Sequence, residues 1–535
     1  MKKQLEIKQQ YLLIPVKMDQ PVTTVTFWQD ENKIYEFEIP AAQFGEEYTY
    51  DFQSALPVKN WIGKQIIIEG DVPVSFMEAI VQAEEEPKSS DRKPLLHLAA
   101  NTGWINDPCG LLYDKGIYHL YFQHNPFGTE WGNMSWGHAV SKDLLHWEQQ
   151  EEALWPDEDG TIFTGSALIN QQGLFGLSDE AQLYIYTSAG NSSKWSAGKK
   201  FVQKLAWSTD GVCTLNKVPG YILDHIEADN RDMKVYWHEE KQVYFAVMYL
   251  DKNDYAILNS PDLKNWTITQ KLDLSPAWEC PNLFQLKTED DKTKWVFWTA
   301  DGFYFIGDFD GSVFTYDETG KCAYRSMLPY AAQTFNGTDR VISIPWMRTN
   351  NPGKVRRGMM GIPRQLTLAV QDGEYILRQK LVNEYEQNKA QVLAAHLKEE
   401  KQDAVVYTQQ EEAVVELVLY PEPKTDFEAD IYGTHITWCD GTLKIDGIAA
   451  RSNGVKDAVK LWDKEEVTEV GQDYRILKPA VCPKKISLLS DGEILEVTLD
   501  DGLMSDAFET SADEKKGNIQ VKSTGNLKLE IYQSK

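Results

Sequence analysis

The phrase Ser141-Lys-Asp-Leu-Leu-His-Trp147 recurs as Ser260-Pro-Asp-Leu-Lys-Asn-Trp266, and a degenerate copy, Ser208-Thr-Asp-Gly-Val-Cys-Thr214, lies between them. Ser-x-Asp commonly starts a turn, which accounts for the first three residues but not for the shared Leu and Trp. Successive copies lie roughly 50 to 70 residues apart among short strand-like runs. This spacing favours four-stranded propeller blades with insertions over a helical solenoid.

Strand-like patterns on both sides of this region predict an all-β chain of three domains. Residues 1–93 should form a small β-sandwich-like accessory domain that ends in an acidic linker, 82–93. Residues 94–385 should form the propeller, and residues 386–535 a connector followed by a C-terminal β-sandwich. The stretch 381–401 is polar and helix-compatible. Strands are expected at 11–16, 22–28, 33–39 and 65–69, and again at 413–420, 441–448, 485–489 and 494–499.

Composition excludes several classes of partner. The 535 residues are 42% hydrophobic and 25% charged, as in a soluble globular protein. The net charge of −27 disfavours nucleic acid and an anionic membrane as partners. A neutral sugar fits better. The 17 Trp and 25 Tyr are compatible with sugar stacking, although a β-rich core explains most of them.

The N-terminal sequence lacks the uninterrupted apolar segment of a signal peptide, and no run reaches transmembrane length, so we expect a cytoplasmic protein. The six cysteines form no Cys-x-x-Cys pair, and the nine histidines show no ligand spacing. Reduced thiols are therefore expected, with no metal and no cofactor. The cysteines are Cys109, Cys213, Cys280, Cys322, Cys439 and Cys482.

Three acidic residues lie beside residues that favour turns. Asp107, in Gly103-Trp-Ile-Asn-Asp-Pro-Cys-Gly110, is expected in a turn before the strand-like run 111–123. Asp232 ends Asn230-Arg-Asp232, and Glu279 lies in Trp278-Glu-Cys-Pro281. On different blades of a propeller, these carboxylates would converge on the central channel.

Two carboxyl groups on opposite sides of a glycosidic bond suffice for its hydrolysis, and a third can act electrostatically. Glu279, between Trp278 and Pro281, is expected in an apolar neighbourhood that raises its pKa and keeps it protonated as a general acid. Asp107, with exposed backbone donors in a turn, should stay ionised. Arg231 reads as an ordinary charge pair with Asp232.

Taken together, these phrases resemble glycoside hydrolase family 32, the β-fructosidases, and most closely its levanase and fructan β-fructosidase members. The resemblance spans nearly the whole chain, and both flanking domains look like those of levanase-like members. It is carried by residues 103–108, 121–126, 130–141, 162–166, 230–232, 279–281, 330–335, 346–348 and 362–364.

The resemblance implies a five-bladed β-propeller and a retaining hydrolase that releases fructose from levan, inulin, fructo-oligosaccharides or sucrose. Asp107 would be the nucleophile, Glu279 the acid/base, and Asp232 the transition-state stabiliser, with Arg231 binding the same sugar. The terminal fructosyl pocket would be lined by Asn106, Gln123, Trp131, Phe163, Thr164 and Trp346.

Four positions depart from the family pattern. Cys109 replaces the usual Asn, Met233 a Pro, Asn282 an Asp, and Thr164 a Ser. Cys109 matters most because a thiol is a weak hydrogen-bonding partner beside the nucleophile. A sucrose or sucrose-6-phosphate hydrolase and a catalytically weakened fructan-binding propeller remain alternatives. A related arabinoside-cleaving propeller fits less well, because the 104–108 and 279–281 phrases follow the fructosidase pattern. Linkage preference, exo or endo attack and oligomeric state stay open.

Overall fold

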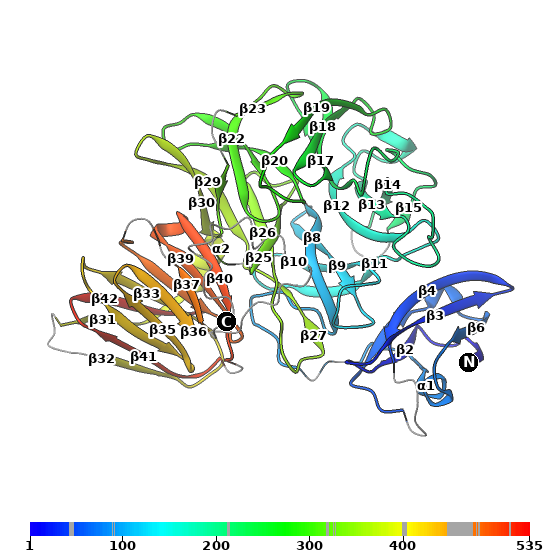
Figure 1. Cartoon of the computed structure of the whole chain (residues 1–535), viewed down its shortest axis with the longest axis horizontal. Coiled ribbons are helices and arrows are strands. Elements are labelled where there is room, and N and C mark those ends of the chain that lie inside the picture. The colour runs from blue at the N-terminus through cyan, green and yellow to red at the C-terminus, as the bar shows by residue number, and fades with distance from the viewer. Residues whose placement is uncertain are drawn as a thin grey trace.

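A computed structural model describes residues 1–41, 48–87, 89, 91–210, 215–316, 320–324, 326, 328–398, 404–446, 474–477, 479, 482–512 and 515–534. Its regular structure is almost entirely β-strand (Figure 1). The α-helices in the described ranges are two single-turn segments, α1 (Val74–Ala79) and α2 (Asn383–Asn388). None of the described helices is long and apolar enough to span a bilayer.

The N-terminal unit, residues 1–83, consists of two sheets that enclose a shared apolar cluster. Alternation of buried and partly exposed side chains, as in β5, directs one face of each strand toward this cluster. The four strands predicted here are confirmed. One sheet has the order β1 (Lys2–Glu6), β6 (Gln65–Gly70), β3 (Val22–Gln29), β4 (Asn32–Pro40), and the other β5 (Phe52–Pro57), β2 (Tyr11–Val16), β7 (Val81–Ala83).

Five antiparallel sheets follow between residues 103 and 381, each built mainly from consecutive strands. The first contains β8 (Gly103–Asp114), β9 (Ile117–Asn125), β10 (Ser135–Ser141) and β11 (Glu148–Leu154). The second contains β12 (Thr161–Ile169), β13 (Gln182–Ala189), β14 (Val202–Ser208) and β15 (Asn216–Lys217). The third contains β16 (Arg231–His238), β17 (Val243–Asp251), β18 (Asp254–Ser260) and β19 (Thr267–Asp273).

The fourth sheet contains β20 (Asn282–Lys287), β21 (Thr293–Trp298), β22 (Phe303–Phe309), β23 (Phe314–Tyr316) and β24 (Lys321–Cys322). The fifth contains β25 (Pro329–Thr334), β26 (Ile342–Met347), β28 (Met359–Met360), β29 (Arg364–Gln371) and β30 (Glu374–Leu381). The first strands of four of these sheets lie together, since β8 contacts β12 and β25, and β12 contacts β16. The short β27 (Arg356–Arg357) pairs in parallel with β8 and links the end of this region to its beginning.

Burial accounts for the different composition of the middle strands, which are rich in apolar residues, and of the polar outer strands. Every residue of β13 is buried, as expected for a strand covered on both faces. The outermost β11 and β19 are polar and mostly exposed or partly exposed, and such residues discourage pairing with another chain.

The recurring Ser-x-Asp-Leu phrase forms the turn between the third and fourth strands of a sheet. Ser141 and Ser260 end β10 and β18, and each hydroxyl donates to the aspartate two residues later. The shared leucines, Leu144 and Leu263, adopt φ of 65° and 61°. The degenerate copy begins in the same way, with Ser208 bonded to Asp210, but its residues 211–214 lie outside the described ranges.

The C-terminal unit has two six-stranded sheets around a second large apolar cluster. The four predicted strands are found within one or two residues, although residues 447–448 of the expected 441–448 strand are not described. One sheet is β31 (Ala390–Leu397), β42 (Leu527–Ser534), β33 (Val414–Pro421), β38 (Ile486–Ser490), β39 (Ile494–Leu499), β40 (Met504–Glu509). The other is β32 (Ala404–Gln409), β41 (Gly517–Ser523), β34 (Phe427–Ile431), β35 (Thr434–Cys439), β36 (Thr442–Asp446), β37 (Tyr474–Leu477).

The helical reading of 381–401 is wrong for most of its length. Of its described residues, 381–398, those of α2 alone are helical, and β31 then pairs with β42, because strand partners far away in sequence outweigh a weak local helix preference. The linker expected at 82–93 begins within β7, which ends at Ala83, and its residues 88 and 90 lie outside the described ranges.

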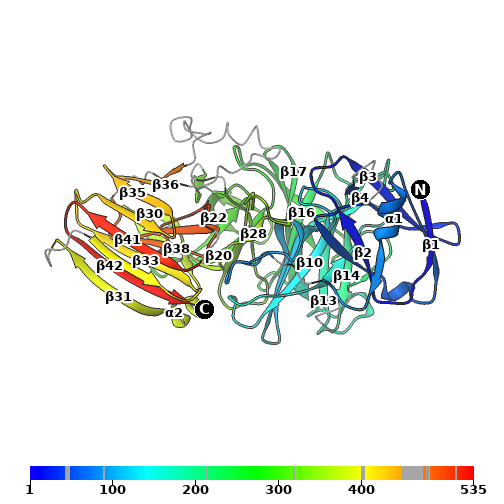
Figure 2. The ribbon, with the colours of Figure 1, turned by 90° about the horizontal axis from the view of Figure 1, so that it is seen from below.

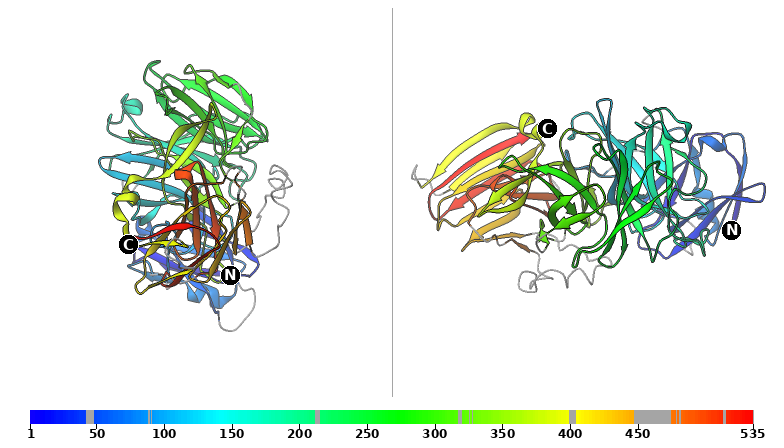
Figure 3. Two further views of the ribbon diagram at one scale, coloured as in Figure 1. Left: turned by 90° about the vertical axis from the view of Figure 1, so that its left-hand side faces the viewer. Right: turned by 90° about the horizontal axis from the view of Figure 1, so that it is seen from above.

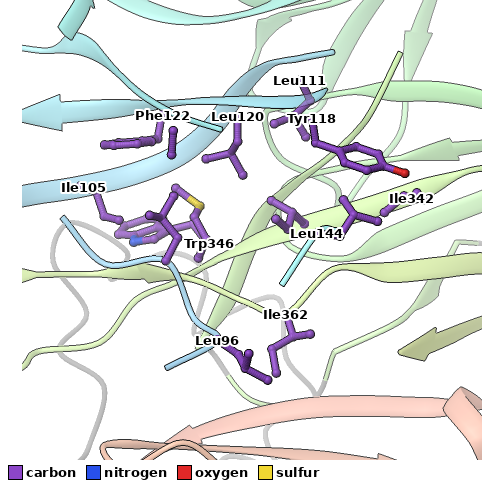
Figure 4. Packing of buried hydrophobic residues seen from close by; sticks show 14 of the residues in the cluster. Leu96, Ile105, Leu111, Tyr118, Leu120, Phe122, Leu144, Ile342, Trp346 and Ile362 are labelled. Atoms are coloured by element: carbon purple, nitrogen blue, oxygen red, sulfur yellow. The ribbon is translucent and has the colours of Figure 1, made fainter. Parts of the chain in front are cut away.

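The N-terminal and C-terminal units lie on opposite sides of the central region (Figures 1 and 2), and the view from above agrees (Figure 3). The largest apolar cluster lies in the central region, where Ile105 and Phe122 of the first sheet pack with residues of the fifth sheet such as Trp346 (Figure 4). It extends to Val414 and Leu489 of the C-terminal unit, so that unit is packed onto the central sheets.

Candidate active site

Asp107 lies within strand β8, not in the turn that the sequence predicts. The pairing of β8 with β9 shifts between Ile105 and Pro108 and again between Cys109 and Leu112, so the strand is bulged on both sides of the Asp-Pro step. A bulge accommodates Pro108, which has no N–H to donate to a ladder. The predicted run 111–123 is likewise two strands joined at Lys115 and Gly116.

Asp232 and Glu279 have left-handed backbones near the start of the first strands of two other sheets. Asp232 has φ of 60°, Glu279 of 51° and Cys280 of 39°. Two consecutive non-glycine residues in this region are unfavourable, and such strain is typical of functional sites. The three carboxylates therefore come from three different sheets, as expected.

Cys280 links two of the carboxylates. Its backbone N–H donates to Oδ2 of Asp232 at 3.1 Å, and its Sγ lies 3.5 Å from Oδ2 of Asp232 and 3.5 Å from Oδ2 of Asp107. One thiol thus touches both aspartates, which brings residues 125 positions apart to one point.

Asp107 is held by side-chain donors, and no backbone N–H of the described residues donates a hydrogen bond to it. Asn106 Nδ2 donates to Oδ1 at 3.2 Å, and Thr164 Oγ1 donates to Oδ2 at 2.9 Å. Burial and the charge of Glu279 raise the pKa of Asp107, while the bonds from Asn106, Thr164 and Cys280 oppose that rise. The three donors therefore help to keep this carboxylate ionised.

Asp232 is nearly inaccessible, with 3% of its surface exposed. Burial raises the pKa of its carboxyl well above the ordinary value; the Arg231 guanidinium opposes this rise, and Glu279 and Asp107 add to it. A buried carboxyl among like charges is easily protonated, which lets it exchange hydrogen bonds with sugar hydroxyls.

The neighbourhood of Glu279 is polar, so the expected apolar setting is wrong. Arg231 Nη2 donates to Oε1, and the Tyr330 hydroxyl donates to Oε2 at 2.8 Å. The Arg231–Asp232 pair is the weaker contact, with Nε 3.8 Å from Oδ2. The Arg231 guanidinium also stacks on Tyr249, with 4.5 Å from Cζ to the ring centroid. Arg231 is thus fixed between the two acids.

These groups line a cavity of about 1040 Å³. A volume of this size accommodates several sugar units. All ten residues named from the sequence line it: Asn106, Asp107, Gln123, Trp131, Phe163, Thr164, Arg231, Asp232, Glu279 and Trp346.

The cavity wall combines aromatic faces with polar atoms. The Trp131 and Phe163 rings meet edge to face at 6.0 Å, and Phe163 meets Phe201 at 5.6 Å. Trp104 Nε1 donates to Oδ1 of Asn106 at 2.8 Å and fixes the orientation of its amide. Trp346 Nε1 has no hydrogen-bond partner among the described residues. Aromatic walls with a few convergent polar groups are typical of sugar sites.

Comparison with known proteins supports the family resemblance of the sequence. Residues 97–380 match the model of the glycosyl hydrolases family 32 N-terminal domain, which covers more than half of the chain. The chain belongs to glycosyl hydrolase family 32. Among curated relatives, it is 36% identical over 255 residues to levanase of Bacillus subtilis (43% of this chain, 36% of levanase). It is 34% identical over 313 residues to invertase of Debaryomyces hansenii (52% and 57%).

The alignments with these relatives span less than two thirds of their length. Among solved structures, exo-inulinase from Aspergillus awamori superimposes with a TM-score of 0.69 at 23% identity, covering 84% of this chain and 99% of the inulinase. At that identity, the likeness establishes a shared fold.

The four residues expected to depart from the family 32 pattern have well-defined surroundings in the structure. Thr164 keeps the hydroxyl that binds Asp107. Asn282 Nδ2 donates to the carbonyls of Cys280 and Ala332, and its Oδ1 accepts from Thr334. Cys109 and Met233 are buried and do not line the cavity.

Sequence reasoning missed several cavity residues of this family 32 chain. Tyr330 and Arg348 lie in phrases that carried the resemblance, and the Arg348 guanidinium stacks on Tyr330 at 4.3 Å. Asp301 is 4% exposed, and burial raises its pKa to about 7, opposed by bonds from Thr299 and backbone amides. Its Ala-Asp-Gly context resembles an ordinary turn, so no local signal singled it out.

Among the residues that the structure describes, no group of three or more His, Cys, Asp and Glu side chains could hold a metal ion. Five of the cysteines form no disulfide in the described part of the chain, and the sixth, Cys213, lies outside the described ranges.

Proposed function

We propose that this family 32 chain is a retaining β-fructosidase that releases fructose from levan, inulin, fructo-oligosaccharides or sucrose. The observation that carries the proposal is the convergence of Asp107, Asp232 and Glu279 on one cavity, with Cys280 in contact with both aspartates. The sequence relatives named levanase and invertase support the same class of substrate.

In the first step, Asp107 attacks the anomeric carbon of the terminal fructose while Glu279 protonates the leaving oxygen. A covalent fructosyl-enzyme results. In the second step, ionised Glu279 takes a proton from water, which attacks the same carbon and releases fructose. Two inversions give net retention. Tyr330 and Arg231 each bind one oxygen of Glu279, so its carboxyl is oriented before the substrate arrives.

The remaining polar groups suit a fructosyl unit. Asp232 and Arg231 present an acceptor and donors to neighbouring hydroxyls, and Asn106 and Gln123 present amides. Trp131, Phe163, Thr164 and Trp346 supply the walls. Hydrogen bonds to hydroxyls strengthen as positive charge develops on the ring, which favours the transition state over the bound substrate.

We also propose that the five central sheets are the blades of a five-bladed β-propeller, residues 94–385. The contacts among their first strands and the pairing of β27 with β8 support a closed ring. Residues 1–93 would be an accessory β-sandwich with its linker, and residues 386–535 a connector and a C-terminal β-sandwich. Both flanking units enclose an apolar cluster between two sheets.

A second candidate is a sucrose-6-phosphate hydrolase. Lys199, Lys200 and Arg357 line the same cavity and would suit a phosphate group. Against it, Lys199 is paired with Asp159 and Arg357 with Glu130. A catalytically weakened fructan binder is the third candidate, and the presence of all three carboxylates, with donors on Asp107 and Glu279, weighs against it.

The test is product analysis on sucrose, sucrose-6-phosphate, inulin and levan, with the Asp107→Asn variant as a blank. Fructose from unphosphorylated substrates supports the proposal. Turnover of sucrose-6-phosphate alone supports the second candidate, and binding without turnover supports the third. The predicted cytoplasmic location stays a prediction that cell fractionation would test.

A further inference from the structure

Two segments of the cavity wall are attached to the N-terminal unit. Segment 127–133 carries Trp131, and segment 190–201 contributes Asn191, Ser192, Lys199, Lys200 and Phe201 to the cavity. Strand β4 and its neighbours contact both segments, although the catalytic carboxylates all lie in other sheets.

Segment 127–133 is held at both ends. The Phe127 ring stacks on Phe37 of β4, with centroids 3.9 Å apart. At the other end, the Asn133 amide pairs with the backbone of Glu38: its Oδ1 accepts from the N–H at 2.7 Å, and its Nδ2 donates to the carbonyl at 2.7 Å. Trp131, which is 57% exposed, lies between these two attachments.

Segment 190–201 is attached through Trp195. The Trp195 backbone N–H donates to Oε1 of Glu36 at 2.9 Å, and its ring packs against the apolar cluster of the N-terminal unit. The adjacent Lys194 donates to Oγ1 of Thr24 at 2.9 Å. Trp195 does not line the cavity, so its side chain serves attachment and leaves substrate contact to other residues.

Internal hydrogen bonds connect this attachment to the cavity face of the segment. The Asn191 N–H donates to the Ser196 carbonyl at 2.9 Å, and the Gly198 N–H donates to Oδ1 of Asn191 at 3.2 Å. These bonds brace the segment internally. Phe201, Phe163 and Trp131 form a continuous row of edge-to-face rings, so both attached segments end at one aromatic rim.

We propose that the N-terminal unit positions this rim and thereby sets a preference for fructan chains over sucrose; the inference rests on the proposed β-fructosidase function. The terminal fructose occupies the enclosed part of the cavity, where Asn106, Gln123 and Asp232 are less than 8% exposed. Sugar units beyond it meet the exposed rim. Sucrose presents one such unit, whereas inulin and levan present several, so a displaced rim costs chain substrates more.

The test compares Trp195→Ala with Trp61→Ala in the full-length protein. Both tryptophans are partly buried against the same N-terminal cluster, but Trp61 packs on Phe27, and among the described residues no hydrogen bond or ring pair joins it to either cavity segment. We expect Trp195→Ala to lower kcat/KM on inulin or levan about three- to tenfold, mainly through KM, with a much smaller change on sucrose. Trp61→Ala should leave the fructan-to-sucrose ratio unchanged.

A second pair of variants tests the attachment from the other side. Glu36→Ala removes the acceptor of the Trp195 N–H, and Glu36→Gln restores an oxygen at that position. The first should lower the fructan-to-sucrose ratio, and the second should recover most of it. An unchanged ratio in both Trp195→Ala and Glu36→Ala would overturn the inference, as would an equal loss on sucrose and fructans.

Hydrogen exchange of the unliganded variants separates this inference from the proposed function. Amides of residues 190–201 should exchange faster in Trp195→Ala and Glu36→Ala than in the wild type or Trp61→Ala. Unchanged exchange would overturn the positioning role whatever the activity. Wild-type protein that cleaves no β-fructoside would overturn the proposed function and the substrate preference together, and faster exchange would then leave only the positioning role.

Discussion

The Thr164 hydroxyl donates a hydrogen bond of 2.9 Å to Oδ2 of Asp107. It connects β12, the first strand of the second sheet, to β8, the first strand of the first sheet. The bond has two consequences: it orients the carboxylate, and it stabilises its ionised form.

Thr164→Val, which keeps the shape and removes the hydroxyl, should lower kcat/KM by about 10- to 100-fold, the usual value of a bond to a charged group. Loss of a donor raises the pKa of Asp107 further, so the acid limb of the pH–rate profile should move to higher pH. Thr164→Ser is the matched control and should retain both rate and profile. An unshifted acid limb in the valine variant would contradict this role.

Asp107→Asn should abolish nearly all turnover, because an amide is a poor nucleophile and carries no charge to stabilise the oxocarbenium-like state. Early-time NMR of the wild-type reaction should show the retained anomer of fructose. Retention also requires the Asp107 and Glu279 carboxyl groups to lie roughly 5 to 5.5 Å apart. An inverted product would rule out Asp107 as the nucleophile.

Glu279→Gln should cost about 10²- to 10⁴-fold on sucrose and far less on an aryl β-fructoside, whose leaving group needs little protonation. The informative comparison is Asp232→Asn, which removes another carboxyl group from the same site but should slow both substrates alike. Equal losses on the two substrates in Glu279→Gln would assign the proton donor elsewhere.

Chelator should not reduce activity, because donors from Asn106, Thr164, Cys280 and Tyr330 already occupy the oxygens of Asp107 and Glu279. The measurement is fructose release before and after dialysis against EDTA. Loss of activity that calcium restores would show that a metal takes part.

The junction between the central and C-terminal units should weaken in alkali. His97 is fully buried, with Nδ1 2.9 Å from Oδ2 of Asp491 and Nε2 3.0 Å from Oε1 of Glu496. Burial disfavours the charged imidazolium, but the hydrogen bonds to Asp491 and Glu496 and the charges of these two carboxylates outweigh burial and raise the pKa of His97 to about 9 from 6.5. Arg364 and His97 overcome the effect of burial on Glu496 and lower its pKa to about 2 from 4.5.

A raised histidine pKa stabilises the fold fully below about pH 6.5, and this contribution is lost as the pH rises through about 9. The lowered glutamate pKa contributes fully above about pH 4.5 and is lost toward pH 2. The free energy of unfolding should therefore fall by on the order of 3 kcal/mol between pH 6.5 and 9. The urea concentration at the unfolding midpoint should fall with it. His97→Gln should make the free energy of unfolding less dependent on pH, whereas His146→Gln, at an exposed position, should not. An equal pH dependence in the wild type and both variants would contradict this prediction.

Much of this protein follows from sequence alone. Strands such as β2 and β39 match their predicted bounds, because alternation of side chains and flanking turn residues are local properties. The three carboxylates could also be named in advance from the turn-forming residues beside them, and the seven binding residues from the phrases that resemble the β-fructosidase pattern. Turn phrases such as Ser260-Pro-Asp were readable because their hydrogen bonds span only two or three residues.

Only the tertiary structure decided which residues are in contact with one another. Asp107 lies in a bulged strand because β9 pairs with it, and α2 ends at Asn388 because β31 pairs with a strand more than a hundred residues away. The polar surroundings of Glu279, the bridging position of Cys280 and the attachment of Trp195 to Glu36 join segments from different sheets. A local sequence pattern indicates which chemistry a residue can support. The partners of that residue depend on how separate sheets pack, and burial over the whole fold determines this packing.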